Sequence, residues 1–302
     1  MIKPPIFESD VNFLGLPLEF SSWDQSKCVV LSAPLDMTTS FRKGTAEGPK
    51  AIIAASTQVE LYDAEFGDEP ALDIGVHTLP SLEPQCVSMQ AAVDRVREGV
   101  GFIVEQGKIP MLLGGEHSVT IGAAQAFKDK MDKTCFVVID AHADLRDSYH
   151  GTPLSHACAS RRLWEMAPMI QVGIRSYSAE EAQWMREKPS GYTAFPARTV
   201  TTRMQAFEES LRILPDQVYI SIDLDGLDPS IMPAVGTPEP GGLLWEETLD
   251  VLRMVCRMKK VVGFDIVELC PMPGWVAPDF LAAKLCYKLL SYACSRVPSS
   301  GN

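Results

Sequence analysis

Short apolar segments alternate along most of the chain with longer segments of helical period, and this alternation is the feature that most constrains the fold. It is typical of a mostly parallel sheet whose connecting helices cover both faces. The predicted strands are residues 28–32, 72–76, 109–113, 135–139, 170–174, 192–195, 218–222 and 261–266. The predicted helices are residues 87–106, 118–131, 178–186, 204–214, 245–258 and 279–293. We therefore expect an α/β fold of three layers (α/β/α) around a central, mostly parallel eight-stranded sheet. No linker divides the chain, so residues 1–302 are expected to form a single domain.

Charge and apolar patterning argue against nucleic-acid and membrane partners, and cysteine spacing indicates the compartment. The chain has 27 Lys and Arg against 39 Asp and Glu, a formal net charge of −12, and a nucleic-acid backbone requires a basic surface instead. No apolar run reaches the roughly 18 residues of a membrane span, and the first ten residues lack the apolar core of a secretory leader. The eight cysteines show no paired Cys-x-x-Cys spacing, which favours free thiols in a reducing compartment. We expect a cytoplasmic protein with neither a nucleic-acid nor a membrane partner.

Unusual polar residues follow three of the predicted strands directly. Gly114-Gly115-Glu116-His117-Ser118 follows one strand, Asp140-Ala141-His142-Ala143-Asp144 follows the next, and Asp223-Leu224-Asp225 follows a third. Ligands of open α/β sheets bind beyond the carboxyl ends of the strands, so these segments are expected at the site. Side chains two apart on an extended segment point the same way, so each group of acids should converge on one side.

Four aspartates at the ends of apolar strands require a cationic partner, because they repel one another and are costly to bury. The sequence places only Arg146 near the middle segment and no basic residue beside Asp223 and Asp225. Two divalent ions are the better interpretation, and a site rich in oxygen with few imidazoles and no thiolate matches Mn²⁺ better than Zn²⁺. Two such ions can hold one water, lower its pKa towards neutrality and deliver hydroxide to a planar carbon. The cluster alone predicts metal-assisted hydrolysis and leaves the substrate open.

Taken in order, GGEHS, DAHAD, SIDLDGLDPS and FDIVELCP resemble the ureohydrolase family, which includes arginase, agmatinase, formimidoylglutamase and the guanidino-acid hydrolases. The early segment Pro34-Leu35-Asp36, followed by Arg42, Gly44, Gly48 and Pro49, resembles the same family, so the resemblance spans about residues 28 to 290. It implies an arginase-like fold, two Mn²⁺ per chain, and hydrolysis of a small guanidino substrate with release of urea. It also implies a homo-oligomer, a trimer or a hexamer.

The resemblance further implies a role for each site residue. His117 and Asp144 would bind one manganese ion and His142 and Asp225 the other, while Asp140 and Asp223 would contact both. The implied metal ligands are thus His117, Asp140, His142, Asp144, Asp223 and Asp225, and the implied catalytic residues are His156, Glu268 and Asp144. Glu268 would hold the guanidinium through two parallel charge-assisted hydrogen bonds. His156 would be the proton shuttle, a role for which His150 is the rival and for which imidazole suits neutral pH.

Within the family, the chain is most similar to agmatinases. The segment 145–152 lacks the polar loop of arginases, and Ile174-Arg175-Ser176 and residues 236–242 are of the agmatinase type. We therefore expect hydrolysis of agmatine to putrescine and urea. The alternative substrates are guanidinobutyrate, guanidinopropionate and arginine, whose carboxylate Arg146 or Arg42 could bind. Two other classes stay open at this point: a metal-binding homologue without turnover, and a deacetylase with one zinc.

Overall fold

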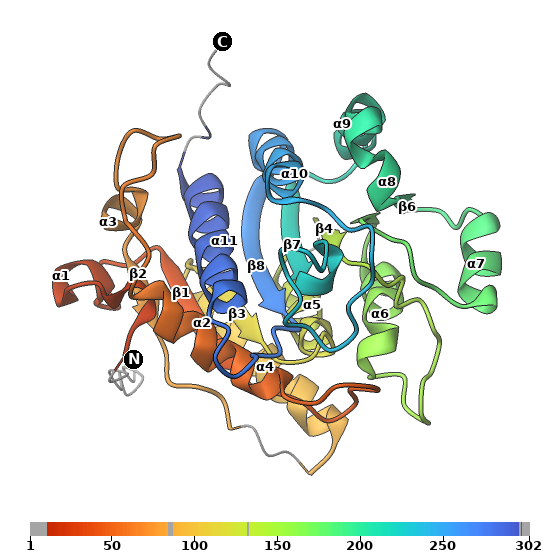
Figure 1. Ribbon diagram of the computed structural model, residues 1–302, viewed down its shortest axis with the longest axis horizontal. Helices are drawn as coiled ribbons and strands as arrows, with labels where there is room; N and C mark the ends of the chain where they lie inside the picture. Colours follow the sequence, from red (N-terminus) through yellow and green to blue (C-terminus); the bar gives the residue numbers. More distant parts are fainter. Residues whose placement is uncertain (1–10, 84–86, 132, 296, 298–302) are drawn as a thin grey trace.

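The computed structural model has eight strands in one sheet, in the order β2-β1-β3-β8-β7-β4-β5-β6, and every neighbouring pair is parallel (Figure 1). The structure describes residues 11–83, 87–131, 133–295 and 297. The strands are β1 (Cys28–Ala33), β2 (Val76–Thr78), β3 (Ile109–Gly114), β4 (Thr134–Ile139), β5 (Met169–Val172), β6 (Tyr192–Phe195), β7 (Gln217–Asp223) and β8 (Lys260–Val267). This confirms the predicted α/β class and the parallel eight-stranded sheet.

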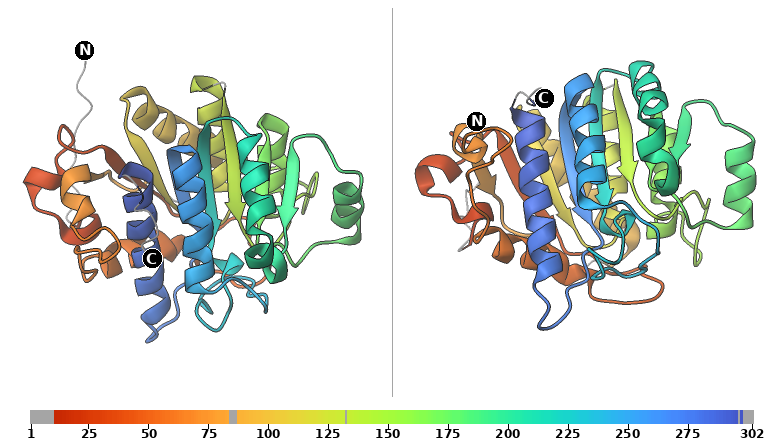
Figure 2. Two further views of the ribbon diagram at one scale, coloured as in Figure 1. Left: turned by 90° about the horizontal axis from the view of Figure 1, so that it is seen from above. Right: turned by 45° about the horizontal axis from the view of Figure 1, so that its top comes forward.

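Helices cover both faces of the sheet, which gives three layers (Figure 2). The helices are α1 (Leu18–Ser21), α2 (Gly48–Ser56), α3 (Pro70–Ile74), α4 (Met89–Glu105), α5 (Val119–Lys130), α6 (Ala159–Met166), α7 (Ala179–Arg186), α8 (Ala197–Val200), α9 (Met204–Arg212), α10 (Trp245–Met258) and α11 (Ala277–Cys294). Alternate residues of a strand point to opposite faces. In β4, Val137 and Ile139 therefore pack in one core with α10 and α11, while Phe136 and Val138 pack in the other with α4 and α5.

Side-chain caps explain where two of the predicted helices begin. The hydroxyl of Ser88 accepts a hydrogen bond from the backbone N–H of Ala91 at 3.2 Å, and α4 starts at the next residue. Ser178 and Glu181 form a reciprocal capping box at the start of α7. Both caps belong to sequence patterns that can be recognised without the fold.

The predicted strand at residues 72–76 was wrong. Pro70 stands at the first helical position and starts α3, and Gly75 ends that helix with a φ of +66°. The strand β2 comes only afterwards, and it is short. The helices α2 and α6 were not predicted, since neither segment shows a long amphipathic pattern.

The expectations about membrane spans, cysteines and a leader can be compared with the described residues. No helix in the described part of the chain is long and apolar enough to cross a membrane. Seven cysteines lie in the same part, and all seven are free thiols. Cys86 and the first ten residues, on which the expectation about a leader rests, lie outside the described residues.

The strand order places β3, β8, β7 and β4 side by side at the centre of the sheet. Parallel strands end at the same edge, so the segments that follow these four strands are neighbours in space. Three of them are the motifs that the sequence singled out, and the fourth begins with Glu268. The fold thus brings together residues that are up to 151 positions apart.

Candidate metal centre

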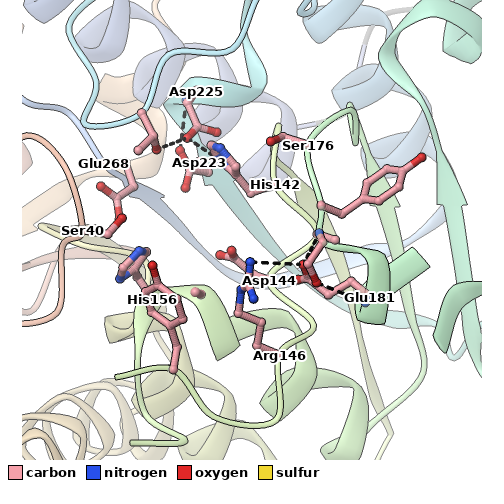
Figure 3. Close-up of a pocket in the computed structure, with 16 residues that line it drawn as sticks. Ser40, His142, Asp144, Arg146, His156, Ser176, Glu181, Asp223, Asp225 and Glu268 are labelled. Carbon is pink, nitrogen blue, oxygen red and sulfur yellow. Dashed lines mark hydrogen bonds and ion pairs between the residues drawn. The ribbon is translucent and has the colours of Figure 1, made fainter. Parts of the chain in front are cut away.

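Four short segments beyond the central strands form the candidate site, and Figure 3 shows side chains from three of them, with His142, Asp223, Asp225 and Glu268 labelled. They are the segment after β3, the segment after β4, a 3₁₀ turn at Leu224–Gly226 after β7, and Glu268 after β8. The glycine at 115 allows the first segment to pack closely on the chain near Leu35. A Cβ atom at Gly115 would lie 2.0 Å from the carbonyl oxygen of Leu35, so no other residue fits there.

The first group of candidate ligands consists of His117, Asp140 and Asp223, and all three side chains are buried. Nδ1 of His117 lies 3.2 Å from an oxygen of Asp140 and 3.2 Å from an oxygen of Asp223. Nδ1 of His117 and Oδ2 of Asp140 are both buried without a hydrogen-bond partner in the described structure. Buried polar atoms are almost always paired, so two such atoms facing each other indicate a site that fits a cation.

The second group consists of Asp140, His142 and Asp225. Nδ1 of His142 lies 2.9 Å from Oδ2 of Asp225 and 3.8 Å from Oδ1 of Asp140. Asp140 is common to both groups, with one oxygen towards each histidine. The arrangement fits two divalent ions that share the carboxylate of Asp140.

Asp144 belongs to neither group, although it was predicted as a ligand of the first ion. Its Oδ2 lies 3.4 Å from Nδ1 of His117, and its side chain is almost fully buried. Its backbone has a φ of +50°, a conformation that aspartate adopts more readily than most residues. Asp223 was expected to contact both ions, and the structure places it in the first group alone.

The hydrogen bonds behind His117 leave Nδ1 free to bind a cation. Nε2 of His117 lies 3.0 Å from the hydroxyl of Ser221, and this hydroxyl donates its single proton to Asp265 at 2.6 Å. Ser221 must therefore accept the proton of Nε2, so the neutral form of the ring presents its lone pair at Nδ1. An outer hydrogen bond that fixes the tautomer in this way is typical of histidine ligands of metals.

Burial and mutual repulsion shift the pKa values of the cluster. Burial, with the charges of Asp223 and Asp144, raises the pKa of Asp140 well above its ordinary value. Burial and Asp225 raise the pKa of Asp223 to about 7. Burial lowers the pKa of His142, but Asp225 and Asp140 outweigh it and raise this pKa to about 11. Such groups hold protons that a divalent ion displaces, and ion binding is therefore expected to release protons.

A cavity of about 280 Å³ opens over these residues, and Glu268 forms part of its wall. Oε1 of Glu268 accepts a hydrogen bond from the backbone N–H of His117 at 2.7 Å. The residue has a φ of +67°, which is a strained conformation for glutamate and is held by a backbone hydrogen bond to Gly115 at 2.8 Å. The segment thus fixes a carboxylate beside the metal ligands, where it can bind a planar guanidinium.

Of the two candidate shuttle histidines, His156 lines the cavity (Figure 3). His150 is exposed, and its ring packs on Tyr149 with 4.2 Å between the ring centroids. It does not line the cavity formed by the described residues. The geometry therefore favours His156 for a role in proton transfer.

The wall of the cavity also carries a basic and an acidic side chain, Arg146 and Glu181. Arg146 lies 3.9 Å from Glu181, and its guanidinium stands 5.1 Å from the ring of Tyr149. Glu181 also accepts a hydrogen bond from the backbone N–H of Leu145 at 2.9 Å. Arg42 instead donates to the carbonyl of Pro271 and does not line this cavity in the described structure. Of the two arginines predicted to bind a substrate carboxylate, only Arg146 is in place.

The sequence did not reveal the supporting role of Arg175. Its guanidinium donates to the carbonyl oxygens of Asp225 and Glu239, each at 2.7 Å, and so holds the ligand turn against the loop after it. Ser221 and Asp265 were also missed, although a buried acid within an apolar strand was a usable signal for Asp265. Glu181 could have been found from its capping box with Ser178.

Comparison with known proteins agrees with this geometry. A family model described as the arginase family matches residues 26–291. N(1)-aminopropylagmatine ureohydrolase of Synechocystis sp. is 39% identical over 279 residues, which cover 90% of this chain and 90% of that protein. Agmatinase of Pyrococcus horikoshii is 35% identical over 268 residues, covering 87% of this chain and 90% of that protein. The crystal structure of agmatine ureohydrolase of Thermoplasma volcanium has a TM-score of 0.84 and 32% identity, with 95% of each chain covered.

Proposed function

The chain belongs to the arginase family and is a ureohydrolase of guanidino compounds, and we propose that it hydrolyses agmatine to putrescine and urea. The observation that carries this proposal is the position of Asp140, which faces both histidine ligands while Glu268 stands in the wall of the same cavity. Because the chain belongs to this family, the deacetylase with one zinc that the sequence left open is no longer a candidate.

We propose Mn²⁺ as the ion at both positions. The first ion would be held by His117, Asp140, Asp144 and Asp223, and the second by Asp140, His142, Asp223 and Asp225. When bound, two such ions supply a water activated for attack at neutral pH. The donors are carboxylates and imidazoles without a thiolate, which suits manganese.

The remaining side chains bind the substrate and transfer a proton. Glu268 holds the guanidinium by charge-assisted hydrogen bonds and so orients its central carbon towards the ligands. Water adds to that carbon, the bond from the carbon to the alkyl nitrogen breaks, and urea forms. His156 takes up the proton that the added water releases and gives it to the alkyl nitrogen as that nitrogen leaves, so that the second product departs as an amine.

The tail of the substrate is proposed to be an amine. Arg146 is the arginine that is in place to bind a substrate carboxylate. Glu181 lies 3.9 Å from it and already offsets its charge. An amine-tailed substrate needs no further cation at this end. N1-aminopropylagmatine, which also ends in an amine, is the second candidate, because relatives with this name are 37–39% identical to the chain.

A panel of substrates tests the proposal. Urea release is measured with the manganese-loaded protein on agmatine, N1-aminopropylagmatine, arginine and guanidinobutyrate, with metal-stripped protein as the control. We expect the highest kcat/KM on agmatine, and a higher value on N1-aminopropylagmatine would replace it with the second candidate. A wide preference for guanidinobutyrate or arginine would contradict an amine tail.

Three further properties belong to the same proposal. Putrescine as product would place the enzyme in polyamine formation. Its proposed location is the cytoplasm. The chain is proposed to act as a trimer or hexamer, which analytical ultracentrifugation of the full chain would test.

A further inference from the structure

A half-buried hydroxyl, that of Thr38, connects His156 to a buried acid in the segment after β3. The hydroxyl of Thr38 donates to Oε1 of Glu116 at 2.9 Å and lies 3.1 Å from Nδ1 of His156. The backbone N–H of His156 also donates to this hydroxyl, at 3.0 Å. The three residues come from three separate segments, and the contact between Thr38 and His156 spans 118 positions.

Glu116 is fully buried, and every hydrogen bond recorded to its carboxylate is one that the carboxylate accepts. Oε2 accepts from the backbone N–H groups of Met37 at 2.8 Å and Thr38 at 2.6 Å. Oε1 accepts from the hydroxyls of Thr38 at 2.9 Å and Ser118 at 2.5 Å. The acid therefore fixes the loop that carries Thr38 and also takes the only hydroxyl proton that Thr38 has.

This assignment of protons determines the state of the imidazole. Because the proton of Thr38 goes to Glu116, the hydroxyl can only accept from His156, so Nδ1 must carry a proton. Nε2 is then the nitrogen that the ring of His156 offers to the cavity. Ser155 is a second neighbour of Nδ1, at 3.3 Å, but no acid is recorded behind it.

We propose that Glu116 and Thr38 are positioning residues that hold His156 in the Nδ1–H tautomer, with Nε2 directed to the reacting groups. The inference rests on the proposed function in one respect, since it takes His156 as the group that transfers the proton. Among the described residues, no hydrogen bond or ion pair joins the side chain of Glu116 or Thr38 to a donor atom of the metal ligands. Glu116 and Thr38 act through the orientation of the ring.

Substitutions of Thr38 test the proposal by kinetics. Thr38→Val keeps the shape of the side chain and removes the hydroxyl, and it should lower kcat for urea release about tenfold to a hundredfold with little change in KM. Thr38→Ser restores a hydroxyl and should recover most of the rate. Manganese content per chain should equal that of the wild type in both variants, because the ligands are intact.

Ser155→Ala is the matched control, since it removes the other neighbour of Nδ1. We expect it to lower kcat much less than Thr38→Val does. A larger loss in Ser155→Ala, an unchanged kcat in Thr38→Val, or no recovery in Thr38→Ser would each overturn the proposal.

A measurement that needs no turnover separates this inference from the proposed function. Nitrogen NMR of the full-length, ¹⁵N-histidine-labelled protein, prepared without paramagnetic manganese, reports which ring nitrogen of His156 carries the proton. We expect a protonated Nδ1 in the wild type and a shift towards protonated Nε2 in Thr38→Val. A wild-type signal with the proton on Nε2 would refute the tautomer. Absence of urea from every guanidine in the panel would refute the function and leave this result standing.

Discussion

Asp140 is the residue on which both ligand groups depend. It is fully buried, and its two oxygens face different histidines. Arg175 and the turn Leu224–Gly226 hold the second group from the other side. Asp140 is the one residue that belongs to both groups of the described structure, so loss of this carboxylate removes a ligand from each group.

Asp140→Ala should reduce bound manganese to less than one ion per chain and lower urea release by at least about a thousandfold. Metal content is measured by mass spectrometry on the dialysed protein, and urea on the same sample. Asp147→Ala, an exposed aspartate that pairs with Arg162, is the control and should retain both. Full activity in Asp140→Ala would contradict the shared ligand.

His156→Ala should keep the manganese content and slow urea release by roughly 10² to 10⁴, which is the usual contribution of a positioned general acid. His150→Ala is the matched control, because His150 is exposed and does not line the cavity of the described structure. The reverse result, a slow His150→Ala and an active His156→Ala, would move the shuttle to His150.

At the scale of elements, a group of buried charges fastens the segment at residues 63–68 to helices α10 and α11. Nζ of Lys288 donates to both oxygens of Asp63, at 3.0 and 2.9 Å, and to Glu65 at 2.8 Å. Arg253 and Tyr292 donate to the same Glu65. Since Lys288 and Asp63 are buried, their pairing matters most when one partner is removed.

Lys288→Met should lower the free energy of unfolding by about 3–5 kcal/mol, because it leaves the buried carboxylate of Asp63 without its cation. The value is measured by urea denaturation followed by circular dichroism. Lys284→Met is the matched control: it lies one turn earlier on α11, is half-buried, and is expected to cost much less. Equal losses in the two variants would show that the pairing with Asp63 is unimportant.

The charges around Glu65 also predict how the stability of the protein changes as the pH becomes acidic. Partial burial raises the pKa of Glu65, but hydrogen bonds from Arg253, Lys288 and Tyr292 outweigh it and lower this pKa to about 2. A depressed pKa gives stability that is present above the unfolded value of about 4.3 and is lost as the pH falls towards 2. Glu65→Gln should therefore show a shallower loss of stability than the wild type between about pH 4.5 and 2. Parallel curves in denaturant titrations over this range would contradict the predicted pairing.

Elements with a clear local pattern were predictable from the sequence. Seven of the eight strands overlap their predicted ranges closely, and α10 was predicted at its observed bounds. The strand at 72–76 failed because a segment of five residues is too short for its apolar spacing to separate a short helix from a strand, and Pro70 with Gly75 decided for the helix. Spacing along strands pointed to Asp140, His142 and Asp144 and to Asp223 and Asp225, because residues two apart on an extended segment face the same side. The contact of Thr38 with His156 was beyond reach, because 118 residues separate them and only the fold brings them together.

At the scale of the whole molecule, the candidate metal centre connects the ends of three central strands, β3, β4 and β7, at one edge of the sheet. Ions that bind only the folded state stabilise it by mass action. Such ions would also offset the burial and the repulsion from Asp223 and Asp144 that raise the pKa of Asp140.

Removal of the ions with a chelator should therefore lower the melting temperature by several degrees, and added manganese should restore it. The shift is measured by calorimetry at neutral pH. Asp140→Ala should show little response to manganese, which separates binding at the centre from binding elsewhere. An equal response in this variant would place the stabilising ions at another site.

The most direct test of the account is a titration of metal-free protein with Mn²⁺ in which bound ions per chain and urea release from agmatine are measured on the same samples. The account predicts that the rate rises with bound manganese and reaches its plateau at two ions per chain. A plateau at one ion, or two bound ions without urea from any guanidino compound in the panel, would contradict it.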